Sequence, residues 1–258
     1  MKVVIVGNAV ILESTFSLIE DFASIIRIEN IDKLVEINEL KSEDYCLWIH
    51  FDSQLKSDCF KDLLKPKLIL TTTTGITHID EELVREFESN GKLITLFQEY
   101  ALLDKITSTA EHTWTLLLNI VSKLAFIVKD HQSSKYNRTI FYKEKQISEC
   151  TIGIIGFGRL GKMSYKYAKA FAKKVIIYDI DRTTYLQENS ESLTLAGSIE
   201  EIFRDCDIIL LHASANSYKK NIITEEILGG ITSGKFLVNT ARAHLINGPA
   251  LLQAISDE

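Results

Sequence analysis

The sequence predicts an α/β protein with two parallel-sheet domains, a Rossmann-type doubly wound sheet preceded by a flavodoxin-like parallel α/β domain. Two observations favour this fold class. From Met1 to about Phe97, short runs rich in Val and Ile alternate with polar, helix-like segments, the pattern of a parallel sheet with crossover helices. A glycine-rich stretch at residues 151–161 then opens a further strand–turn–helix unit. We therefore divide the chain into residues 1–104 and residues 105–258.

The first half contains candidate strands joined by helix-like segments. We expect them near residues 3–6, 25–28, 45–49, 68–71 and 93–97. The first of these strands is followed by Gly7 alone, without the further glycines that a dinucleotide-binding turn needs. This half is therefore not expected to be a second dinucleotide fold.

A hydroxyl-rich loop, residues 71–80, follows the fourth candidate strand and precedes a helix expected to begin near Asp80. The C-terminal end of a parallel strand gathers free backbone N–H groups, which suit a carboxylate or a phosphate. The alternative, that these Thr and Gly residues are ordinary turn and cap residues, is equally consistent with the sequence.

A long amphipathic helix is expected from Ser108 to about Val128. Ser108 and Glu111 have capping-box spacing, and the residues that follow present more apolar surface than a lone helix can bury. The helix should therefore link the domains or meet a partner subunit. The polar stretch after it, residues 129–145, is interpreted as a solvated connector.

The glycine-rich stretch contains Gly156, Gly158 and Gly161 between an apolar run and a helix expected over residues 162–173. In a dinucleotide-binding turn the first glycine makes the tight turn, the second lets a pyrophosphate approach, and the third lets helix and strand pack closely. With 12 glycines in 258 residues, this spacing should arise by chance about 0.03 times. The alternative is a glycine turn that only closes a strand–helix corner.

A second apolar run ends in Asp179, at the place where a carboxylate accepts hydrogen bonds from an adenosine ribose. A carboxylate there favours NAD over NADP because it would repel a 2′-phosphate, although Arg182 nearby leaves some NADP use open. We expect the inward face of the intervening helix to contain Tyr167, Ala168, Ala170 and Phe171.

Two later strands are predicted at residues 207–211, ending in His212, and at residues 236–239, followed by Thr240, Ala241 and Arg242. Both ends fall on the side of the sheet where open α/β folds bind ligands. A helix over residues 249–255 follows.

The composition excludes several classes of protein. A net charge of −6 offers no general attraction for nucleic acid or an anionic membrane, and 46% hydrophobic residues are ordinary for a globular protein. The four cysteines have no metal-ligand spacing, so we expect no metal, and they fit a reducing compartment, the cytoplasm. The longest apolar stretch, residues 114–128, is interrupted by polar residues and is not expected to span a membrane.

Five motifs in order resemble the D-isomer-specific 2-hydroxyacid dehydrogenases over nearly the whole chain. They are residues 74–80, 109–112, 151–161, 207–212 and 237–242. The resemblance implies that residues 1–104 form a substrate domain and residues 105–258 an NAD-binding domain. It also implies a homodimer formed with the long helix, and hydride transfer between nicotinamide and C2 of a D-2-hydroxy acid or 2-keto acid.

The resemblance also implies roles for single residues. Arg242 matches the catalytic arginine, whose guanidinium would bind the substrate carboxylate and polarise the carbonyl. The backbone of Thr74, Gly75 and Ile76 matches the loop that receives that carboxylate. The implied cofactor contacts are Gly156, Gly158, Arg159, Leu160 and Gly161 at the pyrophosphate, Asp179 at the ribose, His212 beside the adenosine, and Thr240 and Ala241 on the nicotinamide side.

Several positions depart from the family pattern. Ser214 and Asn216 stand where Pro and Thr are usual, Ala243 replaces a glycine after the arginine, and Asn247–Gly248 replace an acidic pair. If the backbone at Ala243 needed a positive φ, alanine would strain it by about 1 kcal/mol.

The family's proton donor, a histidine after a proline, and the glutamate that orients it have no counterpart up to Glu258. Since keto-acid reduction needs an acid–base group, we expect a truncated copy, low in activity, with an unpaired sheet edge and exposed apolar helix faces. The alternative function is a non-catalytic NAD(H)-binding sensor or partner subunit.

Overall fold

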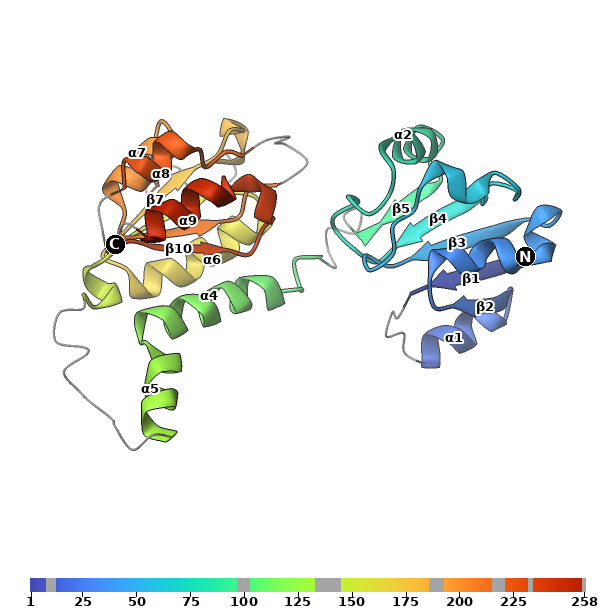
Figure 1. Ribbon diagram of the computed structural model, residues 1–258, viewed down its shortest axis with the longest axis horizontal. Helices are drawn as coiled ribbons and strands as arrows, with labels where there is room; N and C mark the ends of the chain where they lie inside the picture. Colours follow the sequence, from blue (N-terminus) through green and yellow to red (C-terminus); the bar gives the residue numbers. More distant parts are fainter. Residues whose placement is uncertain are drawn as a thin grey trace. The chain divides into compact units, whose positions relative to one another are not determined.

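The computed structural model describes residues 1–7, 13–96, 103–132, 145–185, 193–214, 221–231 and 234–256, except for the side chains of residues 130 and 132. The chain divides into two compact units, Met1–Lys105 and Ile106–Glu258, each with its own parallel sheet (Figure 1). Within the described ranges, no helix is both long enough and apolar enough to cross a membrane.

The first unit contains a five-stranded parallel sheet with the order β2-β1-β3-β4-β5, which is the flavodoxin-like order. Its strands are β1 (Lys2–Val6), β2 (Ser24–Ile28), β3 (Tyr45–Ile49), β4 (Leu68–Thr71) and β5 (Leu93–Thr95), and its helices are α1 (Glu13–Glu20) and α2 (Glu81–Ser89). Short 3-10 helices occupy Ile31–Glu36, Asn38–Lys41 and Ser57–Phe60. The last predicted strand is shorter than expected, and Phe97 lies outside the described residues.

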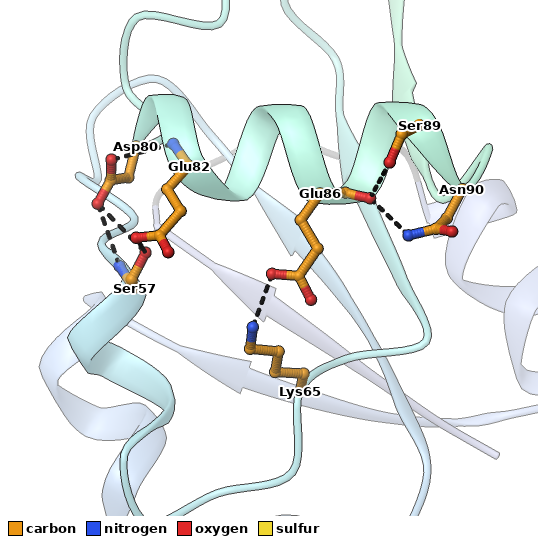
Figure 2. Close-up of polar contacts among 7 residues, drawn as sticks. All are labelled: Ser57, Lys65, Asp80, Glu82, Glu86, Ser89 and Asn90. Atoms are coloured by element: carbon orange, nitrogen blue, oxygen red, sulfur yellow. Dashed lines mark hydrogen bonds and ion pairs between the residues drawn. The ribbon is translucent and has the colours of Figure 1, made fainter.

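Helix α2 is anchored at both ends by side chains (Figure 2). The Asp80 carboxylate caps its first turn by accepting from the Glu82 backbone N–H at 3.3 Å and from the Ser57 N–H at 3.4 Å. These bonds, that to Glu82 first, lower the pKa of Asp80. Lys65 pairs with Glu86 at 2.6 Å farther along. The capped helix therefore fixes the C-terminal side of the hydroxyl-rich loop.

The second unit has the strand order β10-β9-β6-β7-β8, which is the Rossmann order 5-4-1-2-3 when its strands are counted along the chain. Its strands are β6 (Thr151–Ile155), β7 (Lys174–Tyr178), β8 (Thr194–Leu195), β9 (Ile208–Leu211) and β10 (Phe236–Asn239). Its helices are α4 (Ser108–Val121), α5 (Leu124–Gln132), α6 (Arg159–Phe171), α7 (Ile199–Asp205), α8 (Glu225–Gly229) and α9 (Gly248–Ser256), with 3-10 helices at Ile147–Glu149, Arg182–Tyr185 and Ala243–Leu245.

The prediction of one continuous helix from Ser108 to about Val128 is wrong, because two helices occupy this stretch. The chain breaks it at Ser122 and Lys123, where Lys123 has φ of 51°, and α5 begins at Leu124. The predicted capping box is also wrong, because Thr107 is the N-cap and its hydroxyl donates to the Glu111 carboxylate. Helix α4 packs against α6 and β10, so it belongs to the second unit.

Of the four residues predicted on the inward face of α6, only Ala168 is buried. The buried residues are Gly161, Ser164, Tyr165 and Ala168, whereas Phe171 is 45% exposed. Positions i, i+3, i+4 and i+7 form one helical stripe. Small residues occupy most of that stripe, which lets α6 lie close to β6.

The expected sheet edge and apolar helix face are both present. Strand β10 pairs with β9 and is the last strand in the order that the described residues form. Helix α9 has no fully buried residue, and Leu252 and Ile255 are 68% and 62% exposed.

Candidate functional site

The turn between β6 and α6 is closed to side chains at two glycines and open at the third. Gly156 has φ of +95°, and a Cβ there would lie 2.6 Å from the Ala213 backbone N. A Cβ on Gly161 would lie 2.0 Å from the Gly156 carbonyl oxygen. A Cβ on Gly158, by contrast, would meet nothing within 4 Å. The turn therefore leaves free space at the N-terminus of α6, where backbone N–H groups and the helix dipole favour a phosphate.

Asp179 follows β7 and lies beside this turn. Its carboxylate accepts from the Phe157 backbone N–H and, at 2.9 Å, from that of Asp181. The strand ends bring it there because Ile155 of β6 is paired with Tyr178 of β7. The acid is thus held against the glycine turn, and its contact with a ribose stays a prediction.

His212 follows β9 on the other side of the turn. Its Nε2 lies 2.8 Å from the hydroxyl of Ser164 on α6, and its buried Nδ1 has no partner among the described residues. Burial lowers the pKa of His212 to about 4. The imidazole is therefore neutral near pH 7, and its place beside the adenosine stays a prediction.

Arg159 and Leu160 are the first residues of α6 and are partly buried. The Arg159 guanidinium donates to the Ile106 carbonyl at 2.7 Å. This bond ties the start of α6 to the segment before α4. A guanidinium has five N–H donors, so a pyrophosphate contact would share the side chain with that carbonyl.

The segment after β10 is held in place by Asn239. Its side chain accepts from the Ala241 N–H at 2.9 Å and donates to the Arg242 carbonyl at 3.1 Å. The exposed Arg242 guanidinium donates to the Ala241 carbonyl at 3.0 Å. Ala243 does not have a positive φ, so the strain considered for a glycine-to-alanine change is absent.

A pocket of about 530 Å³ lies between α4 and the end of β10. Its lining includes Thr240 and Ala241. Five further lining residues were not predicted as site residues from the sequence: Ser108, Thr109, His112, Leu116 and Asn239. The hydroxyl of Thr240 also contacts the buried Thr113 of α4 at 2.7 Å.

In the first unit, Thr74, Gly75 and Ile76 lie in the loop between β4 and α2. Within the part of the chain that the structure describes, none of their backbone N–H groups donates a hydrogen bond. The loop is closed by the Thr73 hydroxyl, which donates to the Gly75 carbonyl at 2.7 Å. His78, whose pKa is lowered chiefly by burial and then by His50, contacts the Thr71 hydroxyl at 3.2 Å. Three consecutive free N–H groups make a suitable receptor for an anion.

The strand order and the glycine turn define a dinucleotide-binding protein of the doubly wound class. Residues 114–258 match the family model for the NAD-binding domain of D-isomer specific 2-hydroxyacid dehydrogenases. The chain belongs to this family, and the predicted resemblance and fold class are confirmed. The family match identifies NAD as the cofactor of this domain.

The similar proteins include a D-2-hydroxyacid dehydrogenase (NAD(+)) of Clostridioides difficile, 28% identical over 73% of this chain and 54% of the relative. A D-lactate dehydrogenase of Staphylococcus aureus is 26% identical over 86% of this chain and 64% of the relative. The chain thus spans between about half and two thirds of these relatives. A solved structure of D-lactate dehydrogenase from Aquifex aeolicus, complexed with NAD and lactic acid, has a TM-score of 0.79 at 23% identity, covering 99% of this chain and 74% of that one.

Proposed function

We propose that the chain is an NAD-dependent oxidoreductase that transfers a hydride between nicotinamide and C2 of a D-2-hydroxy acid or 2-keto acid. The observation that carries this proposal is the glycine turn, which is sterically closed at Gly156 and Gly161 but open at Gly158. A turn that only joined a strand to a helix would have no need of that opening. The relatives, which are dehydrogenases, support the enzyme over a non-catalytic sensor.

The dinucleotide is proposed to lie across the C-terminal ends of β7, β6, β9 and β10. Its pyrophosphate binds the N-terminus of α6, with Gly158 and the backbone of Arg159 and Leu160 around it. Asp179 accepts from the adenosine ribose, and the neutral His212 lies at the neighbouring strand end. The nicotinamide then lies by Thr240 and Ala241, in the pocket between α4 and β10.

The guanidinium of Arg242 is proposed to bind the substrate carboxylate. The backbone N–H groups of Thr74, Gly75 and Ile76 are proposed, within the first unit, as a receptor for a carboxylate. Arg242 uses one of its donors on the Ala241 carbonyl and retains others for a planar carboxylate. The same guanidinium polarises the carbonyl at C2, which favours hydride addition there.

This assignment predicts that Arg242→Gln weakens 2-keto acid binding to the NADH complex by about tenfold, since one charge-assisted bond is lost. NADH affinity should stay unchanged. Calorimetric titration of NADH, and then of a panel of 2-keto acids, measures both affinities. Arg85→Gln, at an exposed arginine of α2, is the matched control. No effect of any keto acid on the NADH complex, and no NADH oxidation with any of them, would argue for a sensor.

We also propose that the 258-residue chain turns over slowly. Of the described residues that line the pocket, His112 alone has an acid–base side chain. It is exposed, and no carboxylate orients it among the hydrogen bonds and ion pairs that the structure describes. NADH oxidation by this chain measures the residual activity, and rapid turnover would assign the proton transfer to a residue present here.

A homodimer formed through α4 and α5 is the assembly that we propose. Phe126, Val128 and Leu124 of α5 are 65%, 50% and 47% exposed, more apolar surface than a solvated helix normally presents. Phe126→Asp should therefore shift the protein from dimer to monomer in sedimentation velocity, whereas Leu252→Asp on the exposed face of α9 should not. A parent chain that sediments as a monomer would refute the dimer.

The free cysteines support our proposal of a cytoplasmic location.

A further inference from the structure

Two threonine hydroxyls form a short chain between α4 and the segment after β10. The Thr113 hydroxyl donates to the Thr109 carbonyl at 2.8 Å, one turn earlier in α4. The same oxygen lies 2.7 Å from the hydroxyl oxygen of Thr240. Thr113 is fully buried, whereas Thr240 is partly exposed and lines the pocket. These two hydrogen bonds therefore connect the interior of α4 with the pocket.

The number of protons fixes the direction of these bonds. A hydroxyl has one proton and two lone pairs. Because Thr113 gives its proton to the Thr109 carbonyl, the contact between the two hydroxyls needs the proton of Thr240. Thr240 therefore donates to Thr113, and its oxygen presents only lone pairs to the pocket. It is an acceptor that cannot turn into a donor without breaking a buried hydrogen bond.

The position of the pocket along the sheet indicates which part of a dinucleotide would meet this acceptor. The phosphate-binding turn follows β6, and the ribose acid, Asp179, follows β7 on one side of it. A dinucleotide lies across the crevice where the strand order reverses. Its second half must therefore extend to the other side, past β9 to the end of β10, where Thr240 lies.

We propose that the Thr240 hydroxyl selects the amide of the nicotinamide ring by accepting a hydrogen bond from one of the amide N–H groups. Thr113 is then the positioning residue that keeps the Thr240 hydroxyl an acceptor. The proposal rests on the dinucleotide placement in the proposed function. It adds a specificity that a simple contact between α4 and the loop would not have. A ring substituent with a carbonyl but no N–H group cannot form a hydrogen bond with the Thr240 hydroxyl, because both groups are acceptors.

The test compares the affinities of NADH and of its reduced 3-acetylpyridine analogue, in which a methyl group replaces the amide nitrogen. Both are titrated by calorimetry into the whole chain. One hydrogen bond predicts that the parent binds NADH about fivefold more tightly than the analogue. Thr113→Val keeps the shape of the side chain but removes the acceptor for the Thr240 proton. The freed proton can then turn to either carbonyl, so the ratio of the two affinities should fall towards one. Thr113→Ser should keep the fivefold ratio.

The control is Thr115→Val on the same helix, which removes an equivalent hydroxyl bond to the Glu111 carbonyl at 2.9 Å on an exposed face. It should leave the ratio unchanged. Thr240→Val, which removes the acceptor itself, should also bring the ratio towards one and serves if Thr113→Val does not fold. A folded Thr113→Val protein that weakens both dinucleotides equally and keeps the ratio would make Thr113 a mere structural tie and overturn the proposal. A parent protein that binds neither dinucleotide would instead overturn the proposed function, and this inference with it.

Discussion

Replacing Gly158 by alanine should abolish tight NADH binding without unfolding the protein, whereas Gly161→Ala should destabilise the second unit itself. The two glycines belong to one turn but have different surroundings. Gly158 has φ of −72°, which alanine adopts freely, and a Cβ there meets nothing within 4 Å. It is the N-cap of α6, so alanine should cost at most about 1 kcal/mol of stability there. The added methyl group would, however, occupy the space through which the pyrophosphate approaches the helix.

Gly161 has no such space. A Cβ there would lie 2.0 Å from the Gly156 carbonyl oxygen, a backbone atom that can move only if the turn moves. Forcing a methyl group into a packed contact costs about 1–3 kcal/mol or more. We therefore expect a clear fall in the midpoint of thermal unfolding for Gly161→Ala.

Differential scanning fluorimetry and calorimetric titration of NADH separate the two effects. For Gly158→Ala we expect an unfolding midpoint within a few degrees of the parent, because about 1 kcal/mol corresponds to that shift in a domain of this size. NADH affinity should fall at least about tenfold. If Gly158→Ala bound NADH like the parent, the turn would be only a strand–helix corner, the alternative that the sequence left open.

The sheets and the glycine turn were predictable because their signals are local. Runs of Val and Ile mark strands buried on both faces, and the spacing of Gly156, Gly158 and Gly161 marks a turn within a few residues. The break at Lys123 was not predictable, because a positive φ at lysine has no sequence signal such as glycine or asparagine. Residues 97–102 lie outside the described residues.

The predicted face of α6 was wrong except at Ala168, because the buried stripe contains mostly small residues that apolar character does not mark. Taking Gly161 as the start of the stripe leads to Ser164, Tyr165 and Ala168, which are the buried residues. The partners of Thr113 and Ser164, by contrast, come from strand ends 127 and 48 residues away. Such pairs depend on the tertiary fold, and no periodicity in the sequence indicates them. What the sequence could have signalled is a hydroxyl at a buried helical position, which needs a partner.

Acid should destabilise the protein through His212 by about 2 kcal/mol between pH 7 and pH 4.5. Burial lowers the pKa of His212 to about 4 from an ordinary value of 6.5. As pH falls below 6.5, His212 binds a proton in the unfolded chain but not in the folded state. The free energy of unfolding therefore falls until the pH reaches the pKa of His212 in the folded state. The full shift corresponds to about 3 kcal/mol, most of which is lost by pH 4.5. Above pH 7 the group is neutral in both states and contributes no pH dependence.

Urea unfolding of the parent and of His212→Asn at pH 7 and pH 4.5 isolates this effect, because other acid-sensitive groups are common to both proteins. His212→Asn should lose about 2 kcal/mol less than the parent over that interval, whatever its stability at pH 7. Ser164→Ala removes the hydroxyl 2.8 Å from Nε2 but keeps the imidazole buried. Since burial is the cause of the lowered pKa, Ser164→Ala should retain the pH dependence of the parent. Equal losses in the parent and in His212→Asn would mean that the imidazole is solvated, and would place it at an open surface beside the glycine turn instead of under it.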